Sequence, residues 1–248
     1  MARITAGKLV VQIIRRGEVV QTHDEIKARL LASALPNVAF DGYTQAVFDQ
    51  AVADCGVDAG MAALICPAGA TDLAAFAHES DDRKMSDILA GANWQDMRIR
   101  DRITFAIQIR LKIAAQDKEV VRRSAAHFAL PQNGARGTAL IWGTADTIWR
   151  AFGDTSEDVN FYTKRATLAA IYSATLLYWL GDDSVDADDT QEFLHRRIEN
   201  VMQFEKLKSG LGKLPFSGRL LDLANKAAER ARKDTRFQGM PGSVGKQK

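Results

Sequence analysis

Apolar residues recur three and four positions apart along most of this chain, a spacing that places them on one face of an α-helix. The first helix is predicted to begin at Thr22, because Thr22 and Glu25 together form a capping box, and to end near Pro36. The same periodicity predicts further helices over residues 46–54, 58–65, 72–89, 94–115, 120–130, 138–152, 157–180, 189–206 and 218–233. No strand is evident, so the pattern predicts an all-α fold.

Residues 138–180 are the stretch around which we expect the bundle to be organised. Gly153 is predicted to end the first of its two helices, in the left-handed conformation that glycine favours. The second helix is apolar on almost every side from Leu168 to Leu180. Such a helix is usually buried on every side, by its own core and often by a partner subunit, so we expect a homodimer.

Several short motifs lie in this stretch. They are Trp149, Gly153-Asp154, Asn160-Phe161-Tyr162-Thr163-Lys164-Arg165 and Ala169-Ala170-Ile171-Tyr172. Together they resemble the accessory protein family of ubiquinone (coenzyme Q) biosynthesis, the ninth Coq protein, and the similarity extends more loosely over about residues 24–205. The resemblance implies a TetR-regulator-like helical bundle that is not an enzyme. It further implies that the protein binds an isoprenoid quinone or phospholipid and presents it to the di-iron demethoxyubiquinone hydroxylase.

Residues 40–67 have the layout of a helix-turn-helix and resemble the N-terminal part of TetR-type repressors. A recognition helix needs side chains that donate to base edges and cations that neutralise phosphate, but residues 40–71 contain no Lys or Arg. We therefore predict a degenerate motif and no nucleic-acid partner. These residues also disfavour the alternative function, a TetR-type transcriptional regulator with an apolar effector.

Candidate catalytic chemistry is sparse. Cys55 and Cys66 lack metal-type spacing and are expected to be reduced core residues. His78 and the neighbouring acids are expected to form a solvated face rather than a metal site, and the acidic residues 182–189 to cap a helix. A Glu-x-x-His step occurs once, at residues 192–195, whereas di-iron bundles use two. The sequence therefore predicts no catalytic residue, no metal and no cofactor.

Charge is unevenly distributed along the chain. Residues 206–248 hold 11 Lys/Arg and 3 Asp/Glu, whereas the remainder holds 22 and 28. The predicted helix 218–233 is basic and amphipathic, so we expect it to contact an anionic membrane surface, with packing on protein or a solvated tail as alternatives. The residues predicted to contact the membrane are Phe216, Leu220, Leu223, Arg230, Arg232 and Lys233. No apolar run reaches the roughly 18–20 residues of a membrane span, and we expect a cytoplasmic, peripherally membrane-associated bacterial protein.

The bundle is expected to enclose an elongated apolar pocket between residues 94–115, 120–130 and 157–180. A fully packed core is the alternative. The residues predicted to line the pocket and bind lipid are Ile103, Ile107, Leu111, Phe128, Leu168, Ile171 and Tyr172.

A docking surface for the hydroxylase is implied by the family resemblance. The family's docking helix aligns with residues 141–149, and its prominent Asp and Trp correspond to Asp146 and Trp149, with Ile141 and Trp142 on the same helix. Asp146 and Trp149 are three positions apart and are therefore neighbours on a helix surface. The alternative is that Trp149 is buried in the core, as most Trp side chains are.

These predictions divide the chain into four parts. Residues 1–22 form a variable or disordered extension, and residues 23–70 the degenerate helix-turn-helix part. Residues 71–207 form the lipid-binding bundle, and residues 208–248 a linker, a tethered amphipathic helix and a basic tail.

Overall fold

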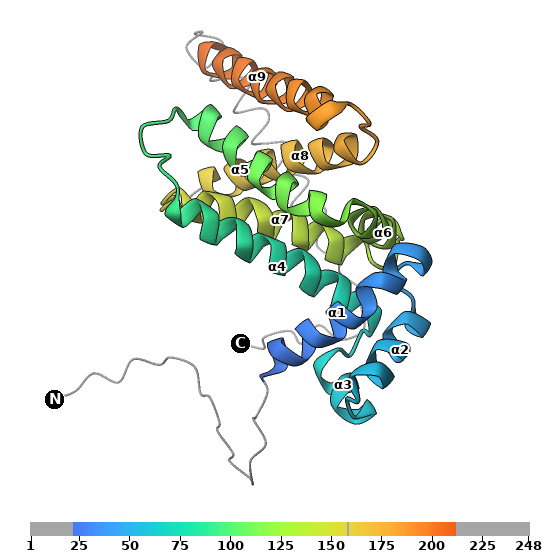
Figure 1. Cartoon of the computed structure of the whole chain (residues 1–248). Coiled ribbons are helices and arrows are strands. Elements are labelled where there is room, and N and C mark those ends of the chain that lie inside the picture. The colour runs from blue at the N-terminus through green and yellow to red at the C-terminus, as the bar shows by residue number, and fades with distance from the viewer. Residues whose placement is uncertain (1–21, 158, 212–248) are drawn as a thin grey trace, which may run out of the picture. The chain divides into compact units, whose positions relative to one another are not determined.

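The computed structural model describes residues 22–157 and 159–211, with no side-chain description from residue 204 onward. Within these residues the chain consists of α-helices and short 3-10 turns without strands, which confirms the predicted all-α fold (Figure 1). A boundary between two compact units falls between His195 and Arg196. The helix predicted over residues 218–233 and its membrane-contact residues lie outside the described residues.

The first three helices of the described chain are α1 (His23–Asp41), α2 (Gln45–Cys55) and α3 (Ala59–Ile65). The predicted capping box is confirmed, because the Thr22 amide donates to Glu25 at 2.7 Å and the Glu25 amide donates to Thr22 at 3.2 Å. Pro36 does not end α1, which continues to Asp41. The buried residues Ala34 and Val38 on either side of Pro36 pack into the core, and this packing maintains the helix.

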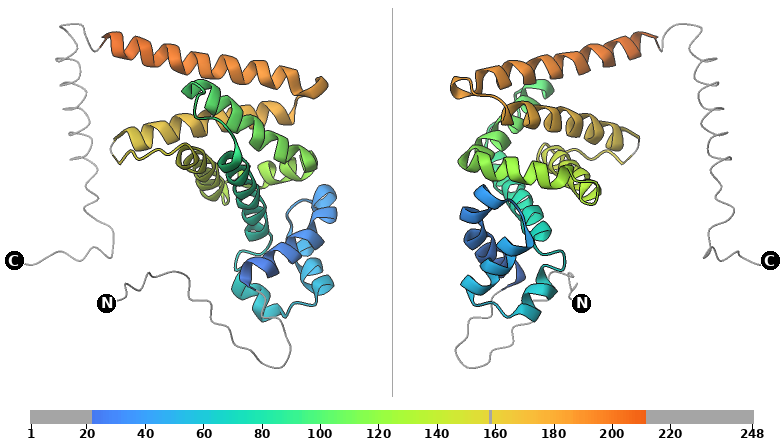
Figure 2. Two further views of the ribbon diagram at one scale, coloured as in Figure 1. Left: turned by 60° about the vertical axis from the view of Figure 1, so that its left-hand side comes forward. Right: turned by 90° about the vertical axis from the view of Figure 1, so that its right-hand side faces the viewer.

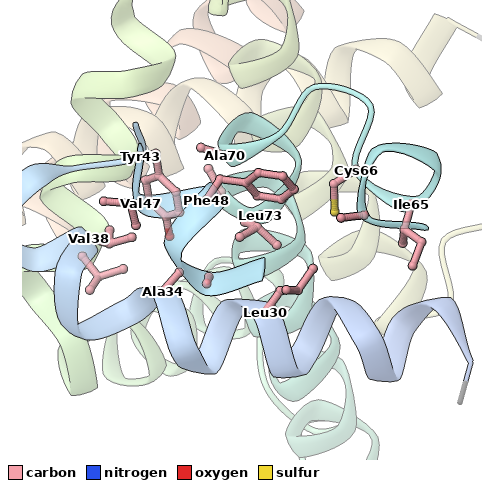
Figure 3. Close-up of a cluster of buried hydrophobic side chains, with 14 residues drawn as sticks. Leu30, Ala34, Val38, Tyr43, Val47, Phe48, Ile65, Cys66, Ala70 and Leu73 are labelled. Carbon is pink, nitrogen blue, oxygen red and sulfur yellow. The ribbon is translucent and has the colours of Figure 1, made fainter. Parts of the chain in front are cut away.

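The core of the helix-turn-helix part lies between α1, α2, α3 and the beginning of α4 (Ala70–Gly91), as Figure 3 shows. Leu30 from α1, Phe48 from α2 and Leu73 from α4 are among its buried members. Gly56, with φ of +61°, makes the turn between α2 and α3, a backbone conformation that glycine adopts without strain. The two predicted helices and their turn are therefore present.

The remaining elements form the bundle. They are α5 (Ile99–Ala114), η1 (Ala115–Asp117), α6 (Lys118–Ala129), α7 (Gly134–Ala151), α8 (Val159–Leu180), η2 (Val185–Ala187) and the start of α9 (Asp188–Leu211). Helix α4 packs against α5 and α7, α7 packs against α8, and α6 packs against α1 and α7 (Figure 2). Gly137 allows the close approach of α7 to α6, because a Cβ there would lie 2.7 Å from the Cβ of Phe128.

Three local expectations are corrected. Helix α4 begins at Ala70, after Gly69, rather than at residue 72. The segment before Ile99 is a connection rather than helix. Helix α8 is not buried on every side, because Leu177 and Tyr178 are exposed. By contrast, Gly153 has φ of +74° just after α7, as predicted.

The acidic turn before α9 is a capping structure. Asp182 accepts hydrogen bonds from the amides of Ser184, at 2.8 Å, and Thr190, at 2.9 Å. Hydrogen bonds from Ser184 and Thr190 hold the pKa of Asp182 well below its usual range. The expectation that residues 182–189 cap a helix is therefore confirmed.

In the described ranges, no single helix is both long enough and apolar enough to cross a membrane. The pair α3 and α4 reaches that length and composition only in combination, and it is bent by 54°.

Candidate ligand cavity and docking surface

A cavity of about 650 Å³ lies between the C-terminal end of α5 and helices α4, α6, α7 and α8, with α1 contributing to one wall. Its apolar lining includes Leu35, Ile113, Val120, Ile141 and Leu176. Exposed residues such as Lys84 and Leu177 also line it, so the cavity reaches the protein surface. Small-molecule sites typically enclose about 300–1,000 Å³ and are mostly apolar, so this cavity has the dimensions of a ligand site.

Two of the seven residues predicted to line the cavity, Phe128 and Tyr172, do line it. The prediction was wrong for five others, which do not line it: Ile103, Ile107, Leu111, Leu168 and Ile171. Ile107, for example, is fully buried in the packed core. On α5 the cavity is bordered instead by Arg110 and Ile113, near the end of the helix. Periodicity identifies the inward face of a helix, but a void forms only where the neighbouring helices fail to fill the space between them.

A buried polar network forms part of the cavity wall. Arg110 donates from Nε to Asp82 Oδ1 at 2.8 Å, and the Thr144 hydroxyl donates to Asp82 Oδ2 at 2.8 Å. His78 Nε2 lies 2.8 Å from the same hydroxyl. Burial, together with the charge of Arg110, lowers the pKa of His78 to about 3, so the imidazole is neutral at physiological pH. The expectation of a solvated face at His78 and Asp82 was therefore wrong.

The predicted docking residues lie on α7 with half-buried side chains. Trp149 donates from Nε1 to the backbone oxygen of Lys164 at 3.1 Å, and Lys164 Nζ lies 5.3 Å from the Trp149 ring centroid. Ile141 and Trp142 line the cavity. Trp149 is thus anchored to α8 through its indole N–H and through the contact of its ring with Lys164.

Asp146, the second predicted docking residue, holds a buried arginine that the sequence analysis did not single out. Arg165 on α8 donates from Nε to Asp146 at 2.6 Å and from Nη1 to Asp154 at 3.0 Å. The Arg165 guanidinium also lies over the Phe161 ring, 3.5 Å from its centroid. Hydrogen bonds from Lys164, and also from Arg165, hold the pKa of Asp154 well below its usual range. This cluster fixes the connection between α7 and α8.

No metal site is formed by residues 22–157 and 159–211, where His, Cys, Asp and Glu do not gather in groups of three or more suited to a metal ion. Cys55 and Cys66 are free thiols, and Cys66 is buried.

The predicted docking residues and the Arg165 cluster lie in the part of the chain that matches a known family. Residues 135–205 match the COQ9 family model. The match covers this segment of the chain and not its N-terminal half. The rat mitochondrial ubiquinone biosynthesis protein COQ9 is 29% identical over 196 residues, which cover 75% of this chain and 61% of the rat protein. The human protein of the same name is 28% identical, with 75% of this chain and 60% of the human protein covered.

Over a shorter alignment, the sequence identity to a COQ9 protein is higher. The COQ9 protein of Xenopus tropicalis is 37% identical over 97 residues, which cover 39% of this chain and 31% of that protein. The chain spans about 60% of the length of its rat and human COQ9 relatives.

The solved structure of a TetR transcriptional regulator from Nitrosomonas europaea shares the fold, with a TM-score of 0.55 and 19% sequence identity. It covers 70% of this chain and 96% of the regulator. The predicted TetR-regulator-like fold is thereby confirmed, and the likeness extends to the fold alone.

Proposed function

We propose that this protein is a non-enzymatic, lipid-binding accessory protein of ubiquinone biosynthesis. The observation that carries the proposal is the largely apolar cavity of about 650 Å³, which occurs in a chain whose residues 135–205 match the COQ9 family model. An isoprenoid quinone or a phospholipid has the long apolar chain that such a lining accommodates. The curated COQ9 relatives carry ubiquinone biosynthesis in their names, which supports the choice of pathway.

The ligand would be presented to the di-iron demethoxyubiquinone hydroxylase on the α7 side of the cavity. Ile141 and Trp142 line the cavity, and Asp146 and Trp149 follow one and two turns later on the same helix. A partner seated on Trp149 would therefore lie close to the cavity lining. This adjacency supports the transfer of a ligand from the cavity to a docked enzyme.

Two further contacts belong to the proposal. The C-terminal segment of residues 206–248 would contact an anionic membrane surface, because it is basic, with 11 Lys or Arg and only 3 Asp or Glu. A second copy of the chain would cover exposed apolar residues of α8 such as Leu177, which is 64% exposed.

Mass spectrometry of lipid extracted from the purified protein tests the central claim. The parent protein is expected to carry near-stoichiometric isoprenoid or phospholipid. Ala125→Trp fills the cavity, because Ala125 lines it, and should reduce the bound lipid strongly. Ala126→Trp is the matched control, because Ala126 is exposed on the same helix and does not line the cavity. A lipid-free parent, or equal lipid in the two variants, would contradict the proposal.

A further inference from the structure

Two tyrosine hydroxyls in the cavity wall are buried without a hydrogen-bond partner. Tyr43, in the connection between α1 and α2, is 6% exposed, and Tyr172, on α8, is completely buried. Both side chains line the cavity. Neither hydroxyl has a partner within the described part of the chain. Buried polar groups in folded proteins are nearly always paired, so two orphans beside one cavity point to a group that enters it.

Both hydroxyls have a proton to donate, because both phenols stay protonated at neutral pH. Burial, reinforced by the charges of Asp81 and Asp117, raises the pKa of Tyr43 above its usual range. Burial raises the pKa of Tyr172 to about 12, against the opposing effect of Arg110. A protonated phenol satisfies its hydrogen by donating to an acceptor oxygen. The group that completes the site therefore carries at least one acceptor.

The charges around the cavity disfavour an anionic acceptor. The cationic side chains among the described liners are Lys84 and Arg110, and each is already paired with a carboxylate. Lys84 Nζ lies 3.0 Å from Asp81, and Arg110 Nε lies 2.8 Å from Asp82. His78 is neutral, as its lowered pKa requires. A carboxylate or phosphate head placed beside the two buried hydroxyls would lose its hydration without gaining a free cation in return.

We propose that Tyr43 and Tyr172 donate hydrogen bonds to the polar end of the cavity ligand, and that this end is a neutral carbonyl oxygen. Ketones, quinones and esters carry such an oxygen, whereas a free fatty acid carries a carboxylate. The inference rests on the proposed function, because it presupposes that an apolar ligand occupies the cavity. Tyr43 and Tyr172 then determine which apolar molecules are preferred.

Isothermal titration calorimetry tests whether the two tyrosines bind a carbonyl oxygen. The three probes share a farnesyl-type hydrocarbon chain and differ in their polar end. Farnesylacetone carries a neutral ketone, farnesene lacks the oxygen, and farnesoic acid is an anion at pH 7.5. The full-length protein, stripped of co-purified lipid with cyclodextrin, should prefer farnesylacetone to both others. Tyr43→Phe and Tyr172→Phe should each weaken farnesylacetone binding about five- to tenfold and leave farnesene binding unchanged. Tyr162→Phe is the matched control, because Tyr162 is 63% exposed and does not line the cavity.

Each contrary outcome has a separate meaning. If no probe binds the parent, the proposed lipid-binding function fails together with this inference. If the probes bind but farnesoic acid is preferred, or the two Phe variants bind farnesylacetone like the parent, only the donor assignment fails. Removing an unpaired buried hydroxyl should leave the Tm of the unliganded protein unchanged or raised. A Tm that falls by several degrees would show that the hydroxyl already has a partner and would overturn the inference.

Discussion

Arg165 Nε on α8 lies 2.6 Å from Asp146 Oδ1 on α7, and the Arg165 side chain is only 2% exposed. Asp146 is therefore more than a surface charge, because it neutralises a buried cation. The second carboxylate at that guanidinium is Asp154, 3.0 Å from Nη1. The pairing makes the geometry of the predicted docking helix depend on α8, so an effect of an Asp146 variant on partner binding includes an effect on folding.

Replacing Asp146 with Ala is expected to lower the free energy of unfolding by about 2–3 kcal/mol, because it leaves Arg165 buried with a single carboxylate partner. Arg150→Ala is the matched control. Arg150 pairs with the same Asp146 at 2.6 Å, but its side chain is 70% exposed, so its loss should cost under about 1 kcal/mol. Urea unfolding of both variants measures the difference. Equal losses for the two would show that the buried pair contributes no more than the exposed one.

His78 should make the protein less stable in mild acid. Its pKa is about 3 in the folded state, against 6.5 for an ordinary imidazole, so between these values the unfolded chain binds a proton that the folded chain does not. The contribution of neutral His78 is complete above pH 6.5 and is lost as the pH falls toward 3. The slope attributable to it is at most about 1.4 kcal/mol per pH unit.

Urea unfolding at pH 7, 6 and 5 checks this dependence. His78→Gln should remove that part of the slope, whereas the same change at the exposed His195 should leave the slope as in the parent. A slope that persists in His78→Gln would assign the acid sensitivity to other groups.

Features of the fold that depend on neighbouring residues in the sequence could be predicted. Thr22 and Glu25 are three positions apart, and their reciprocal hydrogen bonds require only the local backbone, so the start of α1 was evident. The end of α1 was not evident, because a proline such as Pro36 usually disrupts a helix. Tertiary packing of Ala34 and Val38 outweighs that tendency, and no local signal reports such packing.

The candidate site was harder to predict, because it depends on contacts between distant segments. Arg165 stood in a recognised motif, but its burial depends on Asp146, 19 positions earlier, and Asp154. The cavity depends on where six helices leave the space between them unfilled, so an inward-facing residue such as Ile107 gave no indication of its location. Tyr43 lines the cavity from the helix-turn-helix part, whereas the pocket was predicted between residues 94–115, 120–130 and 157–180.

The helix-turn-helix part should not bind DNA. Residues 40–71 contain no Lys or Arg, and α3 exposes Met61 and Leu64, so nothing there neutralises phosphate. Mobility-shift assays near physiological salt should show no binding to the gene's own upstream DNA or to random DNA. The variant Asp58→Lys, Met61→Lys, Leu64→Arg should acquire weak, salt-dependent binding, which verifies the electrostatic reason. A submicromolar, salt-dependent shift by the parent would support the regulator alternative.

The C-terminal tail should carry the membrane contact. Changing Arg230, Arg232 and Lys233 to Glu removes three basic residues, each worth about 1 kcal/mol near an anionic surface, and should weaken binding to phosphatidylglycerol vesicles more than tenfold. The control changes the exposed residues Arg98, Arg100 and Lys112 to Glu and alters the net charge equally. Vesicle sedimentation measures both. Tail-variant binding like the parent's would show that the tail has another role.

Trp149 should be the anchor for the hydroxylase, and its half-buried position determines how that must be tested. Trp149→Ala removes a ring packed against Lys164, so it should cost about 1–2 kcal/mol of stability even without a partner. Truncating an interface Trp typically costs about 2–4 kcal/mol of binding, so affinity for the purified hydroxylase should fall about 30- to 1,000-fold.

The matched control for Trp149→Ala is Trp94→Ala. Trp94 is also half-buried, donates from Nε1 to Leu89 O at 2.9 Å and packs on Phe152, but it lies in the connection before α5. Calorimetry should therefore show similar Tm losses for the two variants and a loss of hydroxylase affinity only for Trp149→Ala. If both variants lose affinity in proportion to stability, or neither loses it, Trp149 supports the fold and does not anchor the partner.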